Sequence, residues 1–199
     1  MSKFITFEGI DASGKSTQAK ILYKILKKQK KKVIISREPG GTKFSEKIRR
    51  IVVKDNIQPL SELFLFYAAR SEHFEKIKKY LKKKYIVICD RYIHSTYVYQ
   101  QHQQKIERKF IHLLQNKIGR YSYPDLTFFI DISSVEAKKR LKLRKNKDKF
   151  DNYSLKKMNF LRKAYLKECK NGKNIIKLDG NKKKNQITKE ILNILVKKK

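Results

Sequence analysis

Cysteine is scarce in this sequence, which contains only Cys89 and Cys169. Their spacing matches neither a metal-binding nor a redox motif, so we expect no disulfide scaffold and a reducing, cytoplasmic environment. The four histidines are also spaced too irregularly to predict a metal site. These absences exclude a small secreted disulfide protein and a zinc-stabilised fold.

Long apolar runs are absent too. No run approaches the length that a helix needs to cross a bilayer, so we expect no membrane partner. An apolar strand pattern begins at Phe4, so we expect no signal peptide. The chain has no internal repeat and no flexible linker. With 199 residues, 40% of them hydrophobic, it can bury one core, and we expect a single domain over residues 1–199.

Acidic residues are few: 18 Asp and Glu stand against 51 Lys and Arg, giving a formal net charge of +33. Such a charge is compatible with nucleic-acid binding, because basic side chains release counterions from phosphate backbones. Most of it, however, is lysine spread through the chain, and no RNA- or DNA-binding module is present. We therefore expect no specific nucleic-acid partner. A basic nucleic-acid-binding protein with a regulatory nucleotide site is the alternative.

Residues 9–16, Gly-Ile-Asp-Ala-Ser-Gly-Lys-Ser, follow the pattern G-x-x-x-x-G-K-[ST] and come directly after the apolar run 4–7. A phosphate-binding loop lies between a strand and a helix, which is the context predicted here. The loop's backbone N–H groups and the start of the helix favour phosphate oxygens. A plain glycine turn before a helix is the alternative. The residues expected to bind a nucleoside triphosphate are Gly9, Ile10, Asp11, Ala12, Ser13, Gly14, Lys15, Ser16 and Thr17.

Apolar and amphipathic segments alternate along the chain. Strands are predicted at residues 4–8, 32–36, 85–90, 126–131 and 174–178, and helices at 15–29, 42–53, 60–81, 105–117, 134–143, 152–170 and 185–196. Short apolar strands separated by helices predict an α/β fold, with a five-stranded parallel sheet covered by helices on both faces. The charged segment 145–151 is the expected mobile lid, and an ordinary solvated connection is the alternative.

Four polar side chains carry the expected chemistry. Lys15 can reach the β- and γ-phosphates, and Ser16 can hold Mg²⁺. Asp90 ends an apolar strand, so its carboxylate is expected beside the phosphate loop, where it can orient magnesium-bound water. Arg91 is expected to face the phosphates. We therefore predict Lys15, Asp90 and Arg91 as catalytic residues, with Ser16 and Asp90 at the metal.

Several further motifs follow in one order: Arg37-Glu38-Pro39-Gly40-Gly41-Thr42, Phe66-Tyr67-Ala68-Ala69-Arg70, Asp90-Arg91-Tyr92, residues 95–100 and Tyr123-Pro124-Asp125-Leu126-Thr127. Together with the phosphate loop, this ordered set resembles thymidylate kinase as far as about Leu166. That family transfers the γ-phosphoryl group of ATP to dTMP, with Mg²⁺, and gives dTDP for dTTP synthesis. The resemblance implies this activity and a three-layer P-loop NTPase fold.

The resemblance also implies how dTMP is held. Phe66 and Arg70 are four residues apart on one helix face, where a ring can stack on a pyrimidine and a guanidinium can reach a base carbonyl. A core phenylalanine and a surface cation are the alternative for this pair. Asp11 would accept the sugar 3′-hydroxyl, and Tyr99 would crowd the 2′ carbon. The other implied dTMP contacts are Arg49 and Gln100 beside thymine, and Arg37 and Arg91 at the acceptor phosphate.

Members of this family keep the arginine that stabilises transition-state charge either in the phosphate loop or in the lid. The loop position is Ala12 here, so the resemblance implies the lid type, with a lid at about residues 142–152. Arg144 is then the expected catalytic arginine, and Arg140 an ATP-binding residue. Lys149 stands where many bacterial relatives have arginine, which keeps the charge but loses the bidentate guanidinium.

The expected substrates are thus dTMP and ATP, the expected cofactor is Mg²⁺, and the expected location is the cytoplasm. Members of the family are commonly homodimers, and the apolar helices at residues 60–69 and 105–117 can supply the dimer face. A P-loop kinase for another nucleoside monophosphate or a nucleoside is the alternative within the same class.

Overall fold

The computed structural model describes residues 3–119, 122–143, 152–172 and 174–197. Its centre is one parallel sheet in the order β2-β3-β1-β4-β5. The strands are β1 (Lys3–Glu8), β2 (Val33–Arg37), β3 (Ile86–Asp90), β4 (Leu126–Asp131) and β5 (Ile175–Asp179). Phe7 of β1 pairs with Asp90 of β3 and with Phe128 of β4, so the carboxyl ends of these neighbouring strands meet at one edge.

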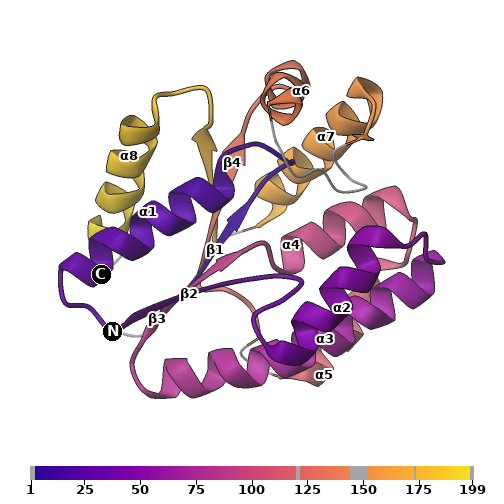
Figure 1. Cartoon of the computed structure of the whole chain (residues 1–199), viewed down its shortest axis with the longest axis horizontal. Helices are drawn as coiled ribbons and strands as arrows, with labels where there is room; N and C mark the ends of the chain where they lie inside the picture. The colour runs from indigo at the N-terminus through magenta and orange to yellow at the C-terminus, as the bar shows by residue number, and fades with distance from the viewer. Residues whose placement is uncertain (1–2, 120–121, 144–151, 173, 198–199) are drawn as a thin grey trace.

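Helices alternate with the strands along the chain. They are α1 (Lys15–Lys28), α2 (Lys43–Lys54), α3 (Pro59–Lys82), α4 (Ile93–Thr96), α5 (Arg108–Ile118), α6 (Ser134–Lys142), α7 (Leu155–Asn171) and α8 (Lys184–Lys197), with a π-helix, η1 (Tyr97–Gln103), after α4. Figure 1 shows α1 and α8 on one side of the sheet and α2, α3 and α5 on the other. The α/β fold predicted from the sequence, with five parallel strands and helices on both faces, is confirmed.

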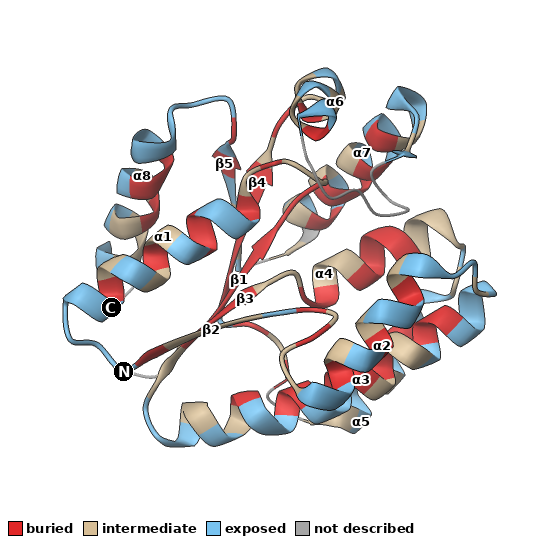
Figure 2. Ribbon diagram, viewed as in Figure 1, coloured by how far each residue is buried: buried red, intermediate tan, exposed pale blue. Residues whose placement is uncertain are grey.

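Successive side chains of β1 point to opposite faces of the sheet, and each face is covered by its own layer of helices. Ile5 faces Leu22 of α1 and Ile191 of α8 in one buried cluster. Phe4, its neighbour, belongs to a second cluster with Leu63 of α3. Consecutive strand residues point to opposite faces, so an apolar strand of this kind needs a helix layer on each side. Figure 2 shows the buried residues concentrated on the sheet and on the helix sides that face it.

The predicted strands and helices are all present, with ends shifted by a few residues. The helix expected from Asn152 begins at Leu155, because the Ser154 side chain accepts the Lys157 N–H and caps the helix there. The elements that the sequence analysis missed are α4 and η1. They are four and seven residues long, shorter than the window of about 11–18 residues over which helical periodicity can be recognised in a sequence.

The remaining predictions from the sequence concern membrane-spanning helices, the two cysteines and the lid. Within the part that the structure describes, no helix is both long and apolar enough to cross a membrane. Cys89 and Cys169 are both free thiols. Most of the lid predicted at residues 142–152, Arg144 and Lys149 included, lies outside the described residues, and its role stays a prediction.

Candidate active site

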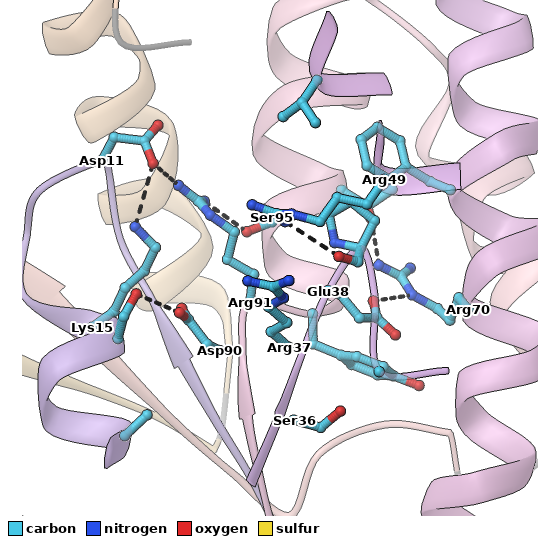
Figure 3. A pocket seen from close by; sticks show the side chains of 18 of the residues that line it. Asp11, Lys15, Ser36, Arg37, Glu38, Arg49, Arg70, Asp90, Arg91 and Ser95 are labelled. Atoms are coloured by element: carbon cyan, nitrogen blue, oxygen red, sulfur yellow. Dashed lines mark hydrogen bonds and ion pairs between the residues drawn. The ribbon is translucent and has the colours of Figure 1, made fainter. Parts of the chain in front are cut away.

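A pocket of about 900 Å³ lies at the carboxyl edge of the sheet. Its walls come from the β1–α1 loop, the ends of β2 and β3, and the helices α2, α3 and η1. Most of the predicted site residues line it: Asp11, Ala12, Gly14, Lys15, Ser16, Thr17, Arg37, Arg49, Phe66, Arg70, Asp90, Arg91, Tyr99, Gln100 and Arg140. Figure 3 shows Lys15 and Asp90 on one side of this pocket, and Glu38 and Arg70 on the other.

The β1–α1 loop has the backbone shape expected of a phosphate-binding loop. Gly9, Ala12 and Gly14 adopt positive φ angles of 147°, 61° and 99°. A Cβ atom on Gly9 would lie 2.6 Å from the Ile130 carbonyl oxygen, so only glycine fits at this close approach. Helix α1 then starts at Lys15. The N–H groups of its first turn lack intrahelical partners and can bind an anion.

Lys15 is buried at the base of this loop, with 6% of its surface exposed. Its Nζ donates to the Ile10 carbonyl oxygen at 3.2 Å and lies 3.5 Å from Asp11 Oδ1. Burial lowers the pKa of Lys15, and the charge of Arg91 lowers it further, while Asp11 and Asp90 act in the opposite direction. The two carboxylates therefore oppose the loss of charge that burial favours.

Ser16 and Asp90, the two residues predicted at the metal, lie in contact. Ser16 Oγ donates a hydrogen bond to Asp90 Oδ2, and Asp90 Oδ1 is buried without a hydrogen-bond partner. A hydroxyl beside a carboxylate with an unused oxygen fits Mg²⁺, which prefers oxygen ligands and keeps several waters. The described residues contain no group of three or more His, Cys, Asp or Glu that could hold a metal.

Arg91 is fixed by side chains from three parts of the chain. Its Nη2 donates to Asp11 Oδ1 at 2.6 Å, and its Nη1 donates to Ser95 Oγ at 3.1 Å and to the Tyr165 hydroxyl at 3.0 Å. The guanidinium also lies over the Tyr99 ring, 5.4 Å from its centroid. This arrangement holds a permanent positive charge at the wall of the pocket.

Glu8 supports this arrangement from behind, and the sequence analysis missed it. Its carboxylate is fully buried and accepts hydrogen bonds from the N–H of Tyr92 at 2.8 Å, the N–H of Ser95 at 3.2 Å and Ser95 Oγ at 2.6 Å. Burial raises the pKa of Glu8, and the hydrogen bond from Ser95 and the charge of Arg91 oppose that rise. An acidic residue that ends an otherwise apolar strand was the available signal.

Arg70 is buried rather than on the surface, so the surface-cation alternative is wrong. Its exposed fraction is 3%, and its Nε donates to Glu38 Oε2 at 2.8 Å. Its Nη2 donates to Thr96 Oγ1 at 2.9 Å. Phe66 is half-buried and lines the same pocket, which confirms that the two side chains share one face of α3.

Glu38 is a second carboxylate that the sequence analysis missed, although it lies inside a quoted motif. Besides Arg70 it contacts His73, whose Nδ1 is 3.0 Å from Glu38 Oε1. His73 Nε2 is in turn 2.6 Å from Ser36 Oγ. The chain of contacts ties the end of β2 to α3 beside the pocket, directly before the cis peptide bond to Pro39. Through Glu38, this chain of contacts holds the Arg70 side chain in place.

Three further arginines predicted at the site, Arg37, Arg49 and Arg140, also line the pocket. Arg37 is half-exposed and donates two hydrogen bonds to Glu46, at 3.2 and 2.8 Å. Arg49 Nη1 donates to the Pro39 carbonyl oxygen at 3.2 Å. Arg140 donates to Glu136 Oε1 at 2.7 Å and to the Gly180 carbonyl oxygen at 3.2 Å. Each guanidinium thus faces the pocket while held by a local partner.

Tyr99 and Gln100 project from η1, the helix that the sequence analysis missed. The Tyr99 hydroxyl donates to Asp11 Oδ2 at 3.3 Å. Gln100 is 3% exposed, and its Nε2 donates to Glu62 Oε1 at 3.0 Å. A π-helical turn is rare and is frequent at functional sites, where it displaces side chains from the α-helical pattern. This geometry brings both residues into the pocket.

Three of the residues predicted in the phosphate loop help to shape the loop and do not line the pocket. Gly9 makes the close approach described above, and Ile10 is buried in the cluster that includes Tyr99 and Leu161. Ser13 donates its backbone N–H to the Ile10 carbonyl oxygen at 3.2 Å. None of the three residues lines the pocket, so we expect any contact that they make with phosphate to come from main-chain groups.

Comparison with known proteins points to one family. A family model described as "Thymidylate kinase" matches residues 7–191. A thymidylate kinase of Wolbachia pipientis subsp. Culex pipiens (strain wPip) is 41% identical over 98% of this chain and 97% of its own length. One of Thermosipho africanus (strain TCF52B) is 40% identical over 98% of both chains.

A solved structure gives the same result in three dimensions. The crystal structure of thymidylate kinase from Ehrlichia chaffeensis superimposes with a TM-score of 0.77, at 34% identity and over 98% of each chain. The sequence relatives and the solved structure therefore agree over nearly the whole length. The chain belongs to the thymidylate kinase family.

Proposed function

We propose that this chain transfers the γ-phosphoryl group of ATP to dTMP, giving ADP and dTDP, with Mg²⁺ as cofactor. One observation carries the proposal: a single pocket joins a phosphate loop to a set of aromatic, guanidinium and amide side chains suited to a pyrimidine base. Family membership supports ATP as the donor and dTMP as the acceptor. We place the reaction in the cytoplasm and in one domain spanning residues 1–199.

The ATP half of the pocket is the β1–α1 loop. Its backbone N–H groups and Lys15 Nζ bind the β- and γ-phosphates, and Arg140 binds ATP from the α6 side. Ser16 and Asp90 hold Mg²⁺, directly or through water. When bound, the ion neutralises charge on the phosphate oxygens. Asp90 lies at the strand end next to β1, so it faces these phosphates.

The acceptor half lies between α2, α3 and η1. Phe66 stacks on thymine, and Arg70 donates to a base carbonyl, because Glu38 holds its guanidinium at the pocket wall. Asp11 accepts the 3′-hydroxyl of the sugar. Tyr99 narrows the space at the 2′ carbon, which favours deoxyribose. The residues that complete this half are Arg49 and Gln100 at the base, and Arg37 and Arg91 at the phosphate.

The reaction itself needs positioning and charge more than covalent chemistry. An oxygen of the dTMP phosphate attacks the γ-phosphorus, the bond to the β–γ bridging oxygen breaks, and ADP leaves. Lys15 and Arg91, joined through Asp11, are placed to stabilise the negative charge that spreads over the transferred group. Arg144, predicted in the lid, is the further arginine that we propose for this role.

We propose that the protein is a homodimer. Leu60 and Phe64 of α3 and Leu113 of α5 are 50%, 48% and 52% exposed, although each is a large apolar residue. Phe64 packs edge-on against Phe110 of α5, with ring centroids 6.1 Å apart, so the two helices present one apolar face. Contiguous apolar surface of this kind marks protein interfaces.

An acceptor panel tests the activity. ADP release from Mg·ATP is followed with dTMP, dUMP, dCMP, UMP and thymidine as acceptors in turn. We expect turnover with dTMP that exceeds turnover with dCMP, UMP or thymidine at least about a hundredfold. The base of dCMP presents a mismatched hydrogen-bond pattern, the 2′-hydroxyl of UMP meets Tyr99, and thymidine lacks the phosphate that accepts the transferred group. Preferred turnover of another acceptor would replace dTMP with that substrate. Absence of turnover with all of them would refute the kinase assignment.

A further inference from the structure

Glu62 is a buried carboxylate that takes no part in the mechanism above. It lies in the first turn of α3 and is 4% exposed. Its Oε1 accepts hydrogen bonds from Gln100 Nε2 at 3.0 Å and from Gln104 Nε2 at 2.7 Å. Gln100 lines the pocket, whereas Glu62 lies behind it. The carboxylate therefore contacts a proposed base-binding residue without facing the base.

The contact fixes which end of the Gln100 amide faces Glu62. An amide side chain has a donor end, the nitrogen, and an acceptor end, the oxygen, and the two differ little in size. A carboxylate accepts hydrogen bonds but does not donate them, so the nitrogen must point toward Glu62. The reversed amide would lose a charge-assisted hydrogen bond and place two oxygens together at a buried position. Gln100 Oε1 is then the end available to the pocket.

We propose that Glu62 is a positioning residue that sets base specificity by keeping the Gln100 oxygen turned toward the pocket as a hydrogen-bond acceptor. The inference rests on the proposed function, in which the base of dTMP lies against Gln100. Thymine carries a hydrogen on N3, which an acceptor oxygen can bind. Cytosine has a lone pair on N3, so the same oxygen meets a second acceptor and the base is rejected.

Glu62→Gln tests this role with little change in volume. The amide that this substitution introduces can either accept from the two neighbouring amides or donate to them, so the Gln100 amide is no longer locked in one orientation. Apparent affinity scales with the fraction of molecules in the competent orientation. We therefore expect kcat/KM for dTMP to fall only about twofold to threefold, while kcat/KM for dCMP rises at least about tenfold, mainly through KM.

Structural damage would not give this result, because it lowers kcat/KM for both acceptors. An unchanged dCMP-to-dTMP ratio in Glu62→Gln would overturn the inference. Glu75→Gln is the matched control: it makes the same change on the same helix, at an exposed residue, and should leave the ratio within about twofold. If Glu62→Gln fails to fold, Glu62→Met removes the acceptor with an apolar side chain of similar length. The ratio should then rise at least about tenfold, and an unchanged ratio again overturns the inference.

Gln100→Ala separates this inference from the proposed function. If the base lies against Gln100, removing the amide raises the dCMP-to-dTMP ratio, since the discriminating oxygen is gone. An unchanged ratio in Gln100→Ala would show that the base lies elsewhere, which refutes the proposed base pocket together with the role of Glu62. A raised ratio in Gln100→Ala with an unchanged ratio in the Glu62 variants would refute the role of Glu62 alone.

Discussion

Arg91 shows how contacts within the protein hold a single side chain in place at this site. Its guanidinium is held by oxygens of Asp11, Ser95 and Tyr165, and its own backbone has a φ of 68°. Ser95 and Tyr165 also donate to the buried carboxylate of Glu8. Donors fixed in this way need no reorganisation when charge develops on a transferred group, which is why they accelerate a reaction.

Replacing Arg91 with alanine should therefore impair catalysis more than folding. We expect kcat with dTMP and Mg·ATP to fall at least about a hundredfold, as the loss of a transition-state charge contact does. Initial rates measure the effect, and thermal unfolding by circular dichroism verifies that the variant is folded. Arg50→Ala, an exposed arginine of α2, is the control and should keep kcat within about twofold. A kcat within about threefold of wild type for Arg91→Ala would refute the role.

The sequence allowed prediction of those residues whose role follows from a local pattern. Lys15 and Ser16 belong to a contiguous motif, and Asp90 ends an apolar strand. Glu8, Glu38 and Glu62 were missed, because their partners are distant in the chain: Glu8 binds Ser95, and Glu62 binds Gln100. A buried carboxylate needs such partners. Its presence in an apolar stretch is visible in sequence, but the identity of the partner is not.

Among the elements, η1 carries the proposed base-contacting Gln100, and α4 carries a histidine with an unusual environment. His94 of α4 has a buried Nδ1 without a hydrogen-bond partner. Burial lowers the pKa of His94 to about 4, while Glu168 acts to raise it, and Arg108 and Arg70 act to lower it. In the folded protein the ring is thus neutral down to about pH 4. The unfolded chain, with an ordinary histidine pKa of about 6.5, binds the proton earlier.

This difference predicts a loss of stability in mild acid. Between about pH 6.5 and pH 4 the unfolded state binds more protons at His94, so the free energy of unfolding falls as pH falls, by about 3 kcal/mol in total. In urea unfolding across this range, His94→Gln should lack that part of the decline. His112→Gln, at an exposed ring bonded to the Tyr123 hydroxyl, should behave like wild type. Equal declines for His94→Gln and wild type would contradict the prediction.

At the scale of the whole molecule, the layers follow from the apolar strands, and the sequence predicted them. Right-handed crossovers between parallel strands then place the connecting loops at one edge, where the pocket lies. The overall charge of +33 did not bear on the fold. Oligomeric assembly is harder to predict from the sequence than the fold, because it depends on which apolar side chains remain on the surface of the folded chain. The helix pattern indicated α3 and α5, but only the structure identifies Leu60, Phe64 and Leu113 as exposed.

That apolar face predicts a dimer of the 23.8 kDa chain in solution. Light scattering coupled to gel filtration should give twice the chain mass for wild type. Phe64→Glu should shift the protein toward the single-chain mass, because burying an unpaired carboxylate in an interface is costly. Val196→Glu changes an equally apolar exposed residue, on α8, and should leave the dimer intact. A wild-type protein of single-chain mass would refute the dimer.

The central claim is that one pocket binds ATP through the phosphate loop and dTMP through α3 and η1. Calorimetric titration of Lys15→Ala and Phe66→Ala with each nucleotide in turn tests it most directly. The account predicts that Lys15→Ala weakens ATP binding at least about tenfold and leaves dTMP binding within about twofold. Phe66→Ala should do the reverse, since stacking on a base contributes about 1–3 kcal/mol. Equal losses for both nucleotides in both variants, or no loss in either, would contradict the account.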